Sequence, residues 1–427
     1  MPQNSATGSN TTNKPGDTTE KTTNKSKITL DPFSAHALTL LENEEFSDCR
    51  IILKSSKDNF YPITFRAHKA LLARSPRLKT ILTSPSYHDG SSSNGTEIEA
   101  ITGETFCMVK AFETALQNLY GLPILNTDTL RHAAVTALGY SDGDENLLQK
   151  VYRYPFPLHA ALADFAMCYA ASGAFFEMKE IVEAGVRLAS EVLHWENVEM
   201  VLYFALCVSA FIISPSTDSV GDNGEATTVT DLRDIYAPRL TTAALTFLVN
   251  YIEAQAQSHP FTLYISAQCK CMPDRIPEHL RQIPGSILSN PKLAEVKFGS
   301  FNSLDEDEQA EQQAKTQQPS PETARLSAIL ICLPYQQLRE AFAIMREKGV
   351  LSGGLAQAIV VEREARRLYA LRVLVEEERQ QQPKPKNQEV NQERIRELGF
   401  REFSTTKSVH DGVVRVQIEL QREWVGM

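Results

Sequence analysis

The stretch Phe65-Arg66-Ala67-His68-Lys69-Ala70-Leu71-Leu72-Ala73-Arg74-Ser75 carries the signals of two kinds of secondary structure in one short run. It begins at the end of an alternating segment, Phe60 to Phe65, which is typical of a β-strand. Its centre, Ala67 to Ala73, reads as a short helix. We expect this helix to end near Ser75-Pro76, because the residue before a proline avoids the α region. The stretch therefore predicts a strand that passes directly into a helix.

Two further strands are predicted around this stretch. Phe46 to Leu53 ends in an apolar run with β-branched residues, which favours a strand. Lys57-Asp58-Asn59 is a turn, so this strand and Phe60–Phe65 are expected to form a hairpin. Pro62 favours an edge position or the first residues of its strand. Thr96 to Ile101 alternates in the same way and predicts a third strand.

Helical periodicity dominates the chain after the third strand. Apolar residues from Phe106 to Tyr120 recur at three- and four-residue steps, and Gly121 and Pro123 end that pattern. Residues 140–157 read as an inserted loop. Further helical patterns occupy 128–138, 160–171, 181–193 and 198–206. The apolar run from Met200 to Ile213 has 14 residues, which is short for a membrane span and predicts a buried helix.

Ser47-Asp48-Cys49 and the run from Phe65 to Ser75 together resemble the signature of the BTB/POZ domain. That signature is an Asp in the first strand, followed by Phe-x-Ala-His-(Lys/Arg)-x-x-Leu-x-x-x-Ser. Leu119-Tyr120-Gly121 resembles its Leu-Tyr-Thr-Gly segment without the Thr. Residues 31–213 thus look like a BTB/POZ domain with the helical continuation of fungal-type members. The resemblance implies an α+β fold, in which a small mixed sheet is flanked by helices.

The resemblance also implies a role in protein–protein interaction and no catalytic activity. Many BTB domains form homodimers, in which the first-strand Asp and the basic residue after the His make a charged pair in a groove at the interface. Those positions are Asp48 and Lys69, with His68 between strand and helix. From the residues alone, a different interpretation stays open. Asp48 would cap or end a strand, Lys69 would lie on a solvated helix face, and His68 would be hydrogen-bonded where the helix begins.

Other BTB proteins recruit a cullin-type ubiquitin ligase, and this gives the alternative function of a substrate adaptor. Such relatives carry a hydrophobic-x-Glu motif in the loop after the second short helix. The matching loop is Ser84 to Thr96, and its nearest approach to the motif is Tyr87-His88-Asp89. Tyr87 and Asp89 are therefore the candidate cullin contacts. Asp in place of Glu shortens the side chain by one methylene, so the contact geometry would differ.

The remaining chain is divided by segments with almost no large apolar residues, which cannot bury enough surface to offset their ordering entropy. We expect these segments to be a disordered tail over 1–30, a linker over 214–230, an acidic linker over 301–322 and a linker over 379–391. The acidic linker interrupts a mostly α-helical region, 231–378. Residues 392–427 end in a short β-strand, Val413–Trp424, whose nearest candidate partner is Arg401–Ser408.

Three helices are predicted in the C-terminal half, over 231–256, 334–348 and 355–379. Pro238 is expected to kink or split the first. In the last, Ala358, Val361, Ala365 and Leu368 form the predicted apolar face. Its Arg and Glu residues carry no net charge over 362–379, which favours a solvated, salt-bridged face over a phosphate-binding one. The second and third helices are expected to form an antiparallel hairpin packed on the helical continuation.

Composition and motifs narrow the function. The chain has 427 residues and a formal charge of −10, which argues against a nucleic-acid-binding surface. No phosphate-binding glycine motif occurs, so no nucleotide cofactor is expected. The N-terminus has no apolar core for a secretory signal, and the seven cysteines follow no disulfide framework. We therefore expect an intracellular protein, cytoplasmic or nuclear, with protein partners and no membrane association.

One local cluster leaves a third function open, that of a zinc-dependent enzyme. Cys269-Lys-Cys271 with His259 and His279 would supply two thiolates and two imidazoles for Zn²⁺. The spacing between these residues matches no zinc finger, and Cys-x-Cys is less usual than Cys-x₂-Cys in structural sites. Ordinary loop thiols are the favoured interpretation, so no metal is expected.

Overall fold

The computed structural model describes most of the predicted folded regions. The described residues are 30–56, 60–84, 96–103, 105–139, 158–212, 231–256, 260–266, 268–274, 276–277, 280–281, 319–379, 395–410 and 414–426.

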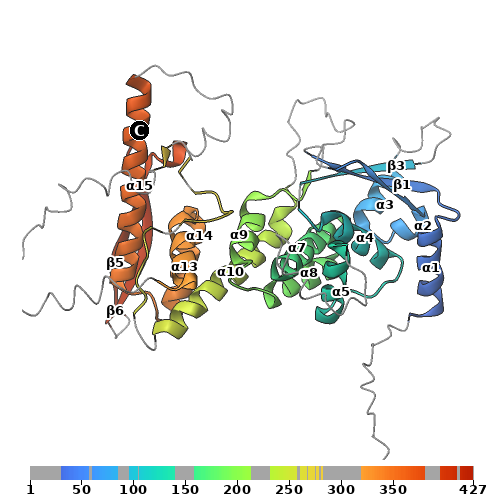
Figure 1. The fold of residues 1–427 in the computed structure, drawn as a ribbon, viewed down its shortest axis with the longest axis horizontal. Coiled ribbons are helices and arrows are strands. Elements are labelled where there is room, and N and C mark those ends of the chain that lie inside the picture. The colour runs from blue at the N-terminus through green and yellow to red at the C-terminus, as the bar shows by residue number, and fades with distance from the viewer. Residues whose placement is uncertain are drawn as a thin grey trace, which may run out of the picture.

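A small mixed sheet lies at the N-terminal end of the molecule (Figure 1). Its strands are β1 (Cys49–Ser55), β2 (Ile63–Ala67), β3 (Thr96–Thr102) and β4 (Phe211–Ile212), in the order β2-β1-β3-β4. β1 runs antiparallel to β2, with Cys49 opposite Ala67, and parallel to β3. The predicted hairpin and the prediction of a mixed α and β structure are confirmed.

Helix α1 (Pro32–Asn43) precedes the sheet and was not predicted. Asp31 caps it, because its Oδ1 accepts hydrogen bonds from the amides of Phe33 and Ser34, each at 3.0 Å. Pro32 occupies the first helical position, where its missing N–H costs nothing. The Asp-Pro pair was therefore a readable helix start that hydrophobic periodicity alone does not reveal.

Helices cover the sheet and continue beyond it. They are α2 (Lys69–Leu72), α3 (Pro76–Thr83), α4 (Met108–Leu119), α5 (Thr127–Ala137), α7 (Leu158–Phe176), α8 (Lys179–Glu191) and α9 (Val198–Cys207). α7 packs against α4, α5 and α8 and is buried on almost every side. The run from Met200 to Ile213 is not one buried helix as predicted. α9 ends at Cys207, and Phe211–Ile212 instead form β4 beside β3.

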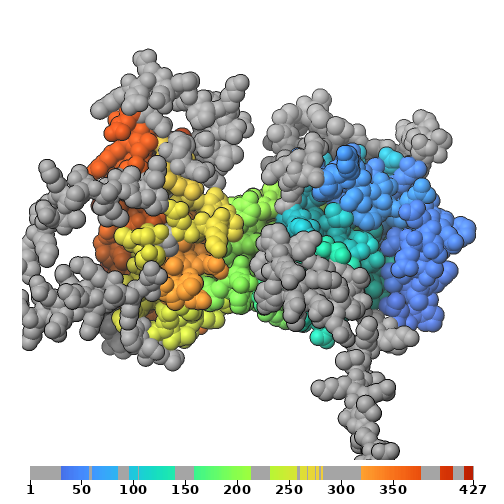
Figure 2. Space-filling view, in the orientation of Figure 1, coloured from blue at the N-terminus to red at the C-terminus, as the bar shows by residue number. Residues whose placement is uncertain are grey.

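Helix α10 (Arg233–Ala256) joins the two halves of the molecule. It packs on α7, α8 and α9, and it also contacts α14 (Tyr335–Glu347). Trp195 lies against Phe247 and Tyr251 of α10, with ring centroids 5.2 and 4.7 Å apart. α10 is continuous through Pro238, so the predicted split is wrong. In the space-filling view the molecule narrows near this junction (Figure 2).

The C-terminal half contains α13 (Pro321–Cys332), α14, α15 (Gly353–Arg379), β5 (Phe400–His410) and β6 (Val414–Trp424). α13 was not predicted, and it begins at Pro321, inside the segment expected to be linker. β5 and β6 pair antiparallel from Phe400–Trp424 to His410–Val414. The predicted pairing of these segments is confirmed, although the structure has a long hairpin instead of one short strand.

The predicted hairpin of two helices is wrong. α14 packs on α10 and β6, whereas α15 packs on β5 and α13. The predicted face of α15 is also wrong, since Val361 and Leu368 are 53% and 44% exposed while Arg363 and Arg367 are 1% and 4% exposed. Helical periodicity cannot reveal this, because the partners that bury the two arginines come from other parts of the chain.

None of the helices in the described part of the chain combines the length and the apolar character needed to cross a bilayer.

Candidate interaction site at the start of helix α2

The junction between β2 and α2 is built as its sequence predicts, with one shift. Ala67 is the last residue of β2 and is fully buried, and His68 is extended, with φ −117° and ψ 118°. The helix begins at Lys69, two residues later than predicted. Ser75 follows the helix, where its Oγ donates to the carbonyl of Phe176 at 2.7 Å and accepts from the amide of Leu78 at 3.2 Å.

His68 is held by both of its ring nitrogens. Its Nε2 lies 2.6 Å from the carbonyl oxygen of Glu45, which only accepts, so Nε2 carries the proton. Tyr120 Oη accepts the backbone N–H of His68 at 2.9 Å, and it lies 3.0 Å from His68 Nδ1. When Nε2 carries the only ring proton, the hydroxyl of Tyr120 donates to Nδ1. His68 therefore ties the α1–β1 turn to the end of α4.

Asp48 and Lys69 are brought together through the backbone. Asp48 Oδ1 accepts a hydrogen bond from the amide of Lys69 at 2.8 Å. A carboxylate at a helix N-terminus is stabilised by the unpaired N–H groups and by the helix dipole. The ion pairs within 4.0 Å among the described residues do not join Asp48 to the Lys69 ammonium. Whether the two side chains pair between two copies of the chain stays a prediction.

Phe46 is the residue at this site that the sequence reasoning missed. It lies in the turn between α1 and β1, and its side chain is 85% exposed. Its φ is 57°, in the left-handed region that bulky residues avoid at a cost of about 1–2 kcal/mol. Glu44, two residues earlier, has the same φ. A strained backbone that presents an aromatic ring to solvent points to a functional role. No sequence pattern predicts this conformation.

The titratable groups beneath the site are protonated at neutral pH. Burial raises the pKa of the Tyr120 hydroxyl to about 12 and that of the Cys49 thiol to about 11. Cys49 is thus a poor nucleophile, and Tyr120 keeps the proton that it offers to His68. The arrangement supports a fixed surface.

Two sets of predicted residues lie wholly or partly outside the described residues. Tyr87 and Asp89 lie outside the described residues, and so do His259 and His279. The described half of the proposed zinc set, Cys269 and Cys271, makes contacts with other residues. Cys269 interacts with Cys332, which together with burial raises the pKa of the Cys269 thiol, while the amide of Cys271 donates to Glu199 at 2.5 Å. No group of three or more candidate ligands is found within the described ranges.

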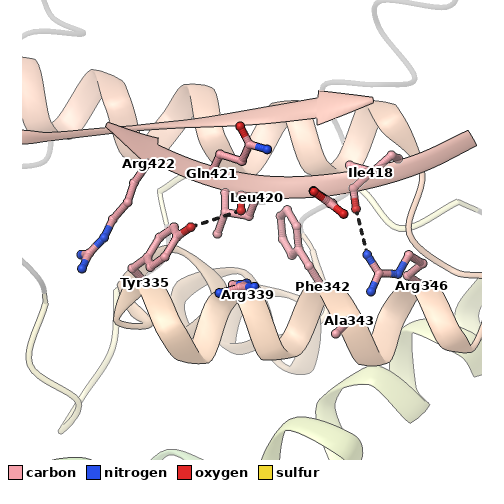
Figure 3. A pocket seen from close by; sticks show the side chains of 10 residues that line it. Tyr335, Arg339, Phe342, Ala343, Arg346, Ile418, Leu420, Gln421 and Arg422 are labelled. Atoms are coloured by element: carbon pink, nitrogen blue, oxygen red, sulfur yellow. Dashed lines mark hydrogen bonds between the residues drawn. The ribbon is translucent and has the colours of Figure 1, made fainter. Parts of the chain in front are cut away.

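A second surface lies between α14 and β6 in the C-terminal half (Figure 3). It is a groove of about 460 Å³, lined by Tyr335, Arg339, Phe342, Ala343, Arg346, Ile418, Glu419, Leu420, Gln421 and Arg422. Tyr335 Oη donates to the carbonyl of Leu420 at 3.2 Å, and Arg346 donates to that of Ile418 at 3.5 Å. These bonds cover the carbonyls at the outer edge of β6, so side chains of α14 protect a sheet edge.

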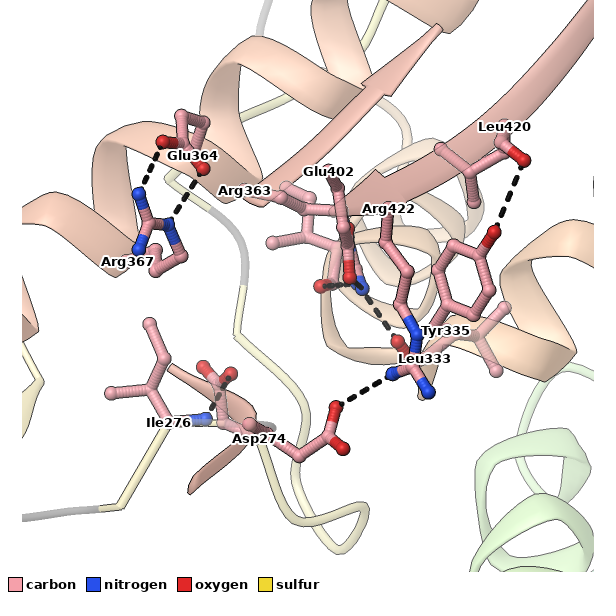
Figure 4. Close-up of polar contacts among 12 residues, drawn as sticks. Asp274, Ile276, Leu333, Tyr335, Arg363, Glu364, Arg367, Glu402, Leu420 and Arg422 are labelled. Atoms are coloured by element: carbon pink, nitrogen blue, oxygen red, sulfur yellow. Dashed lines mark hydrogen bonds and ion pairs between the residues drawn. The ribbon is translucent and has the colours of Figure 1, made fainter. Parts of the chain in front are cut away.

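Buried charged side chains link the elements of the C-terminal half to one another (Figure 4). Arg363 has no exposed side-chain surface and makes two hydrogen bonds to Glu402, at 2.7 and 2.9 Å. Its guanidinium also donates to the carbonyls of Ile331 and Leu333. One side chain therefore connects α15 with β5 and with the end of α13. These contacts are the physical reason that Arg363 faces inward.

A scan against protein-family models finds no match to this chain, and a search of curated proteins finds none either.

Proposed function

We propose that residues 31–213 form a self-associating, BTB-like interaction module, and that the chain is a non-catalytic scaffold for protein partners. The observation that carries the proposal is Phe46. It is 85% exposed at a φ of 57°, two residues before Asp48 and adjacent to the carbonyl of Glu45 that holds His68. Aromatic anchors of this kind dominate the binding energy of protein interfaces.

Self-association is favoured because the site offers both signs of charge. A two-fold interface brings the same patch of two copies together. Asp48 is exposed and Lys69 is half-buried, so the carboxylate of one copy can face the ammonium of the other. This is the pairing that the BTB resemblance implies. It is compatible with the hydrogen bond from the Lys69 amide to Asp48 Oδ1, since the second carboxylate oxygen remains available.

Light scattering coupled to size-exclusion chromatography tests the charged pair. The double variant Asp48→Asn/Lys69→Gln keeps an oxygen that accepts the Lys69 amide, so the junction should stay folded. We expect the wild-type chain to self-associate and this variant to do so more weakly. A wild-type chain that is monomeric at every concentration would reject the proposal.

The aromatic anchor has its own test. Phe46→Asp should weaken self-association at least tenfold, because it places a charge where a ring is buried in the complex. Tyr61→Asp is the matched control, since Tyr61 is 92% exposed at the other end of the β1–β2 hairpin. Equal weakening by both variants would show that Phe46 has no special role.

A further inference from the structure

The exposed face of α15 carries an apolar stripe that the described part of the chain leaves uncovered. Val361, Leu368 and Val375 are 53%, 44% and 46% exposed, and they are spaced seven residues apart. Ala358, just before Val361, and Ala365, between Val361 and Leu368, are also exposed. The stripe is Ala358, Val361, Ala365, Leu368, Arg372 and Val375, with alternating steps of three and four residues. Such spacing is that of the a and d positions of a coiled coil.

The stripe is self-complementary when two copies of α15 lie antiparallel. Matching the centres of the two stripes places Ala365 opposite Leu368 and Ala358 opposite Val375. Every apolar layer then combines a small side chain with a large one, so the layers fill evenly. Over the five turns from Ala358 to Val375, the stripe is about 26 Å long.

Charge also selects this orientation. In the antiparallel register Arg372 lies opposite Val361 of the second copy, whose neighbours Glu362 and Glu364 are ion-paired with Arg366 and Arg367 of their own chain. Arg372 is exposed, and its guanidinium has no hydrogen-bond or ion-pair partner within the described part of the chain. A parallel pair in register would instead place Arg372 against Arg372 and leave both alanine layers underfilled. Like charges opposite each other are destabilising.

We propose that α15 pairs with α15 of a second copy of this chain as a short antiparallel coiled coil. The contact is independent of the proposed site at Phe46, because it uses the opposite end of the molecule (Figure 1). Its occupant is this chain itself, since the match of small and large side chains is internal to one sequence and the antiparallel register keeps the two Arg372 side chains apart.

Sedimentation velocity on the full chain tests the pairing in the Asp48→Asn/Lys69→Gln background, which weakens the other proposed contact. We expect concentration-dependent association there, and at least tenfold weaker association after Leu368→Glu, which brings two carboxylates to the centre of the pair. Ile235→Glu on α10 is the matched control, because Ile235 is 46% exposed against 44% for Leu368. Association left unchanged by Leu368→Glu would overturn the proposal, and so would equal weakening by Ile235→Glu. Circular dichroism checks that each variant keeps its helices.

Cysteine cross-linking tests the orientation. The exposed Cys207 and Cys271 are first replaced by Ser, and Ala358→Cys and Val375→Cys are prepared as separate proteins. Mild oxidation should join the two proteins when they are mixed and should leave each one alone uncross-linked. Efficient cross-linking of either protein with itself would contradict the antiparallel register, and absence of any cross-link would overturn the pairing.

Discussion

At the scale of single residues, Asp164 is the clearest buried ionisable group of the N-terminal half. It lies on α7 and is 4% exposed, and its Oδ2 accepts the amide of Cys107 at 2.7 Å, just before α4 begins. Burial raises its pKa to about 6, although the hydrogen bond from Cys107 opposes that shift. The carboxyl group thus fixes where α4 starts. Once this buried group is ionised, it lowers the stability of the folded state.

The pH dependence of unfolding tests this account of Asp164. Because its pKa is raised in the folded state, its contribution to stability is fully present below about pH 4 and is lost as the pH rises to about 6. Two units of pKa correspond to about 3 kcal/mol. Asp164→Asn keeps an oxygen for the Cys107 amide and cannot ionise. Urea titrations should therefore show that the difference in unfolding free energy between variant and wild type changes between pH 4 and pH 6. Above about pH 6 this difference should be constant. A difference that is the same at every pH would contradict the account.

Tyr120 provides a second test at this scale. Tyr120→Phe removes the oxygen that accepts the backbone N–H of His68 and that donates to its ring. An unpaired buried donor costs about 1–3 kcal/mol, so we expect a loss of that size in chemical denaturation. Tyr203→Phe, at a 37% exposed tyrosine on α9, is the control and should change stability little. Equal stability of the Tyr120 variant and wild type would show that the His68 network is dispensable.

The sequence predicted part of this site and missed the rest for a definable reason. The motif placed Asp48, His68 and Lys69 around one strand–helix junction, and the structure brings all three there. Phe46 was missed because its importance lies in its backbone conformation and its exposure, which no residue pattern encodes. The contact of His68 with Tyr120 joins residues that are 52 positions apart, so only the folded chain reveals it.

At the scale of elements, α15 shows how a regular helical pattern can predict the wrong buried face. Ala358, Val361, Ala365 and Leu368 repeat as a core face should, yet the structure exposes them and buries Arg363 and Arg367. The buried face includes Ile359 and Val360 as well. Both faces are apolar enough to be a core, and what selects between them is a carboxylate on β5. Periodicity along one helix cannot contain that information.

The Arg363–Glu402 pair should therefore be worth far more than the surface pairs of the same hairpin. Removing one member of a buried pair leaves the other charge unpaired and costs about 3–5 kcal/mol. We expect Arg363→Met to lose that much in denaturant titrations, and Arg363→Met/Glu402→Leu to lose clearly less than the sum of the single variants. Arg401→Met is the control. Arg401 pairs with Glu423 at 3.8 Å with both side chains more than half exposed, so the loss should stay below about 1 kcal/mol. Additive effects of the two buried substitutions would show that the pair is not coupled.

At the scale of the whole molecule, α10 makes the two halves dependent on each other. Its buried face includes Leu240, Leu245 and Leu248, and one hydrophobic core runs from the N-terminal sheet through α10 to α14. The domain boundary predicted at 213 therefore leaves the helical continuation without one of its covering elements. A fragment that ends there exposes the surfaces of α7, α8 and α9 that α10 covers.

Two fragments test this dependence. Residues 31–213 should unfold at a lower temperature than residues 31–256 and should bind a dye that reports exposed apolar surface, because only the longer fragment retains α10. The emission of Trp195, which packs on Phe247 and Tyr251, should shift to longer wavelength in the shorter fragment. Equal melting temperatures would mean that the N-terminal half folds without α10.

We propose self-association of this chain through the junction at Phe46, Asp48 and Lys69. The most direct measurement is the molar mass by light scattering of the full chain carrying Leu368→Glu, which removes the proposed pairing of α15. We predict twice the mass of one chain at high concentration, and the mass of one chain once Phe46→Asp is added. A single-chain mass at every concentration before Phe46 is changed would contradict the claim.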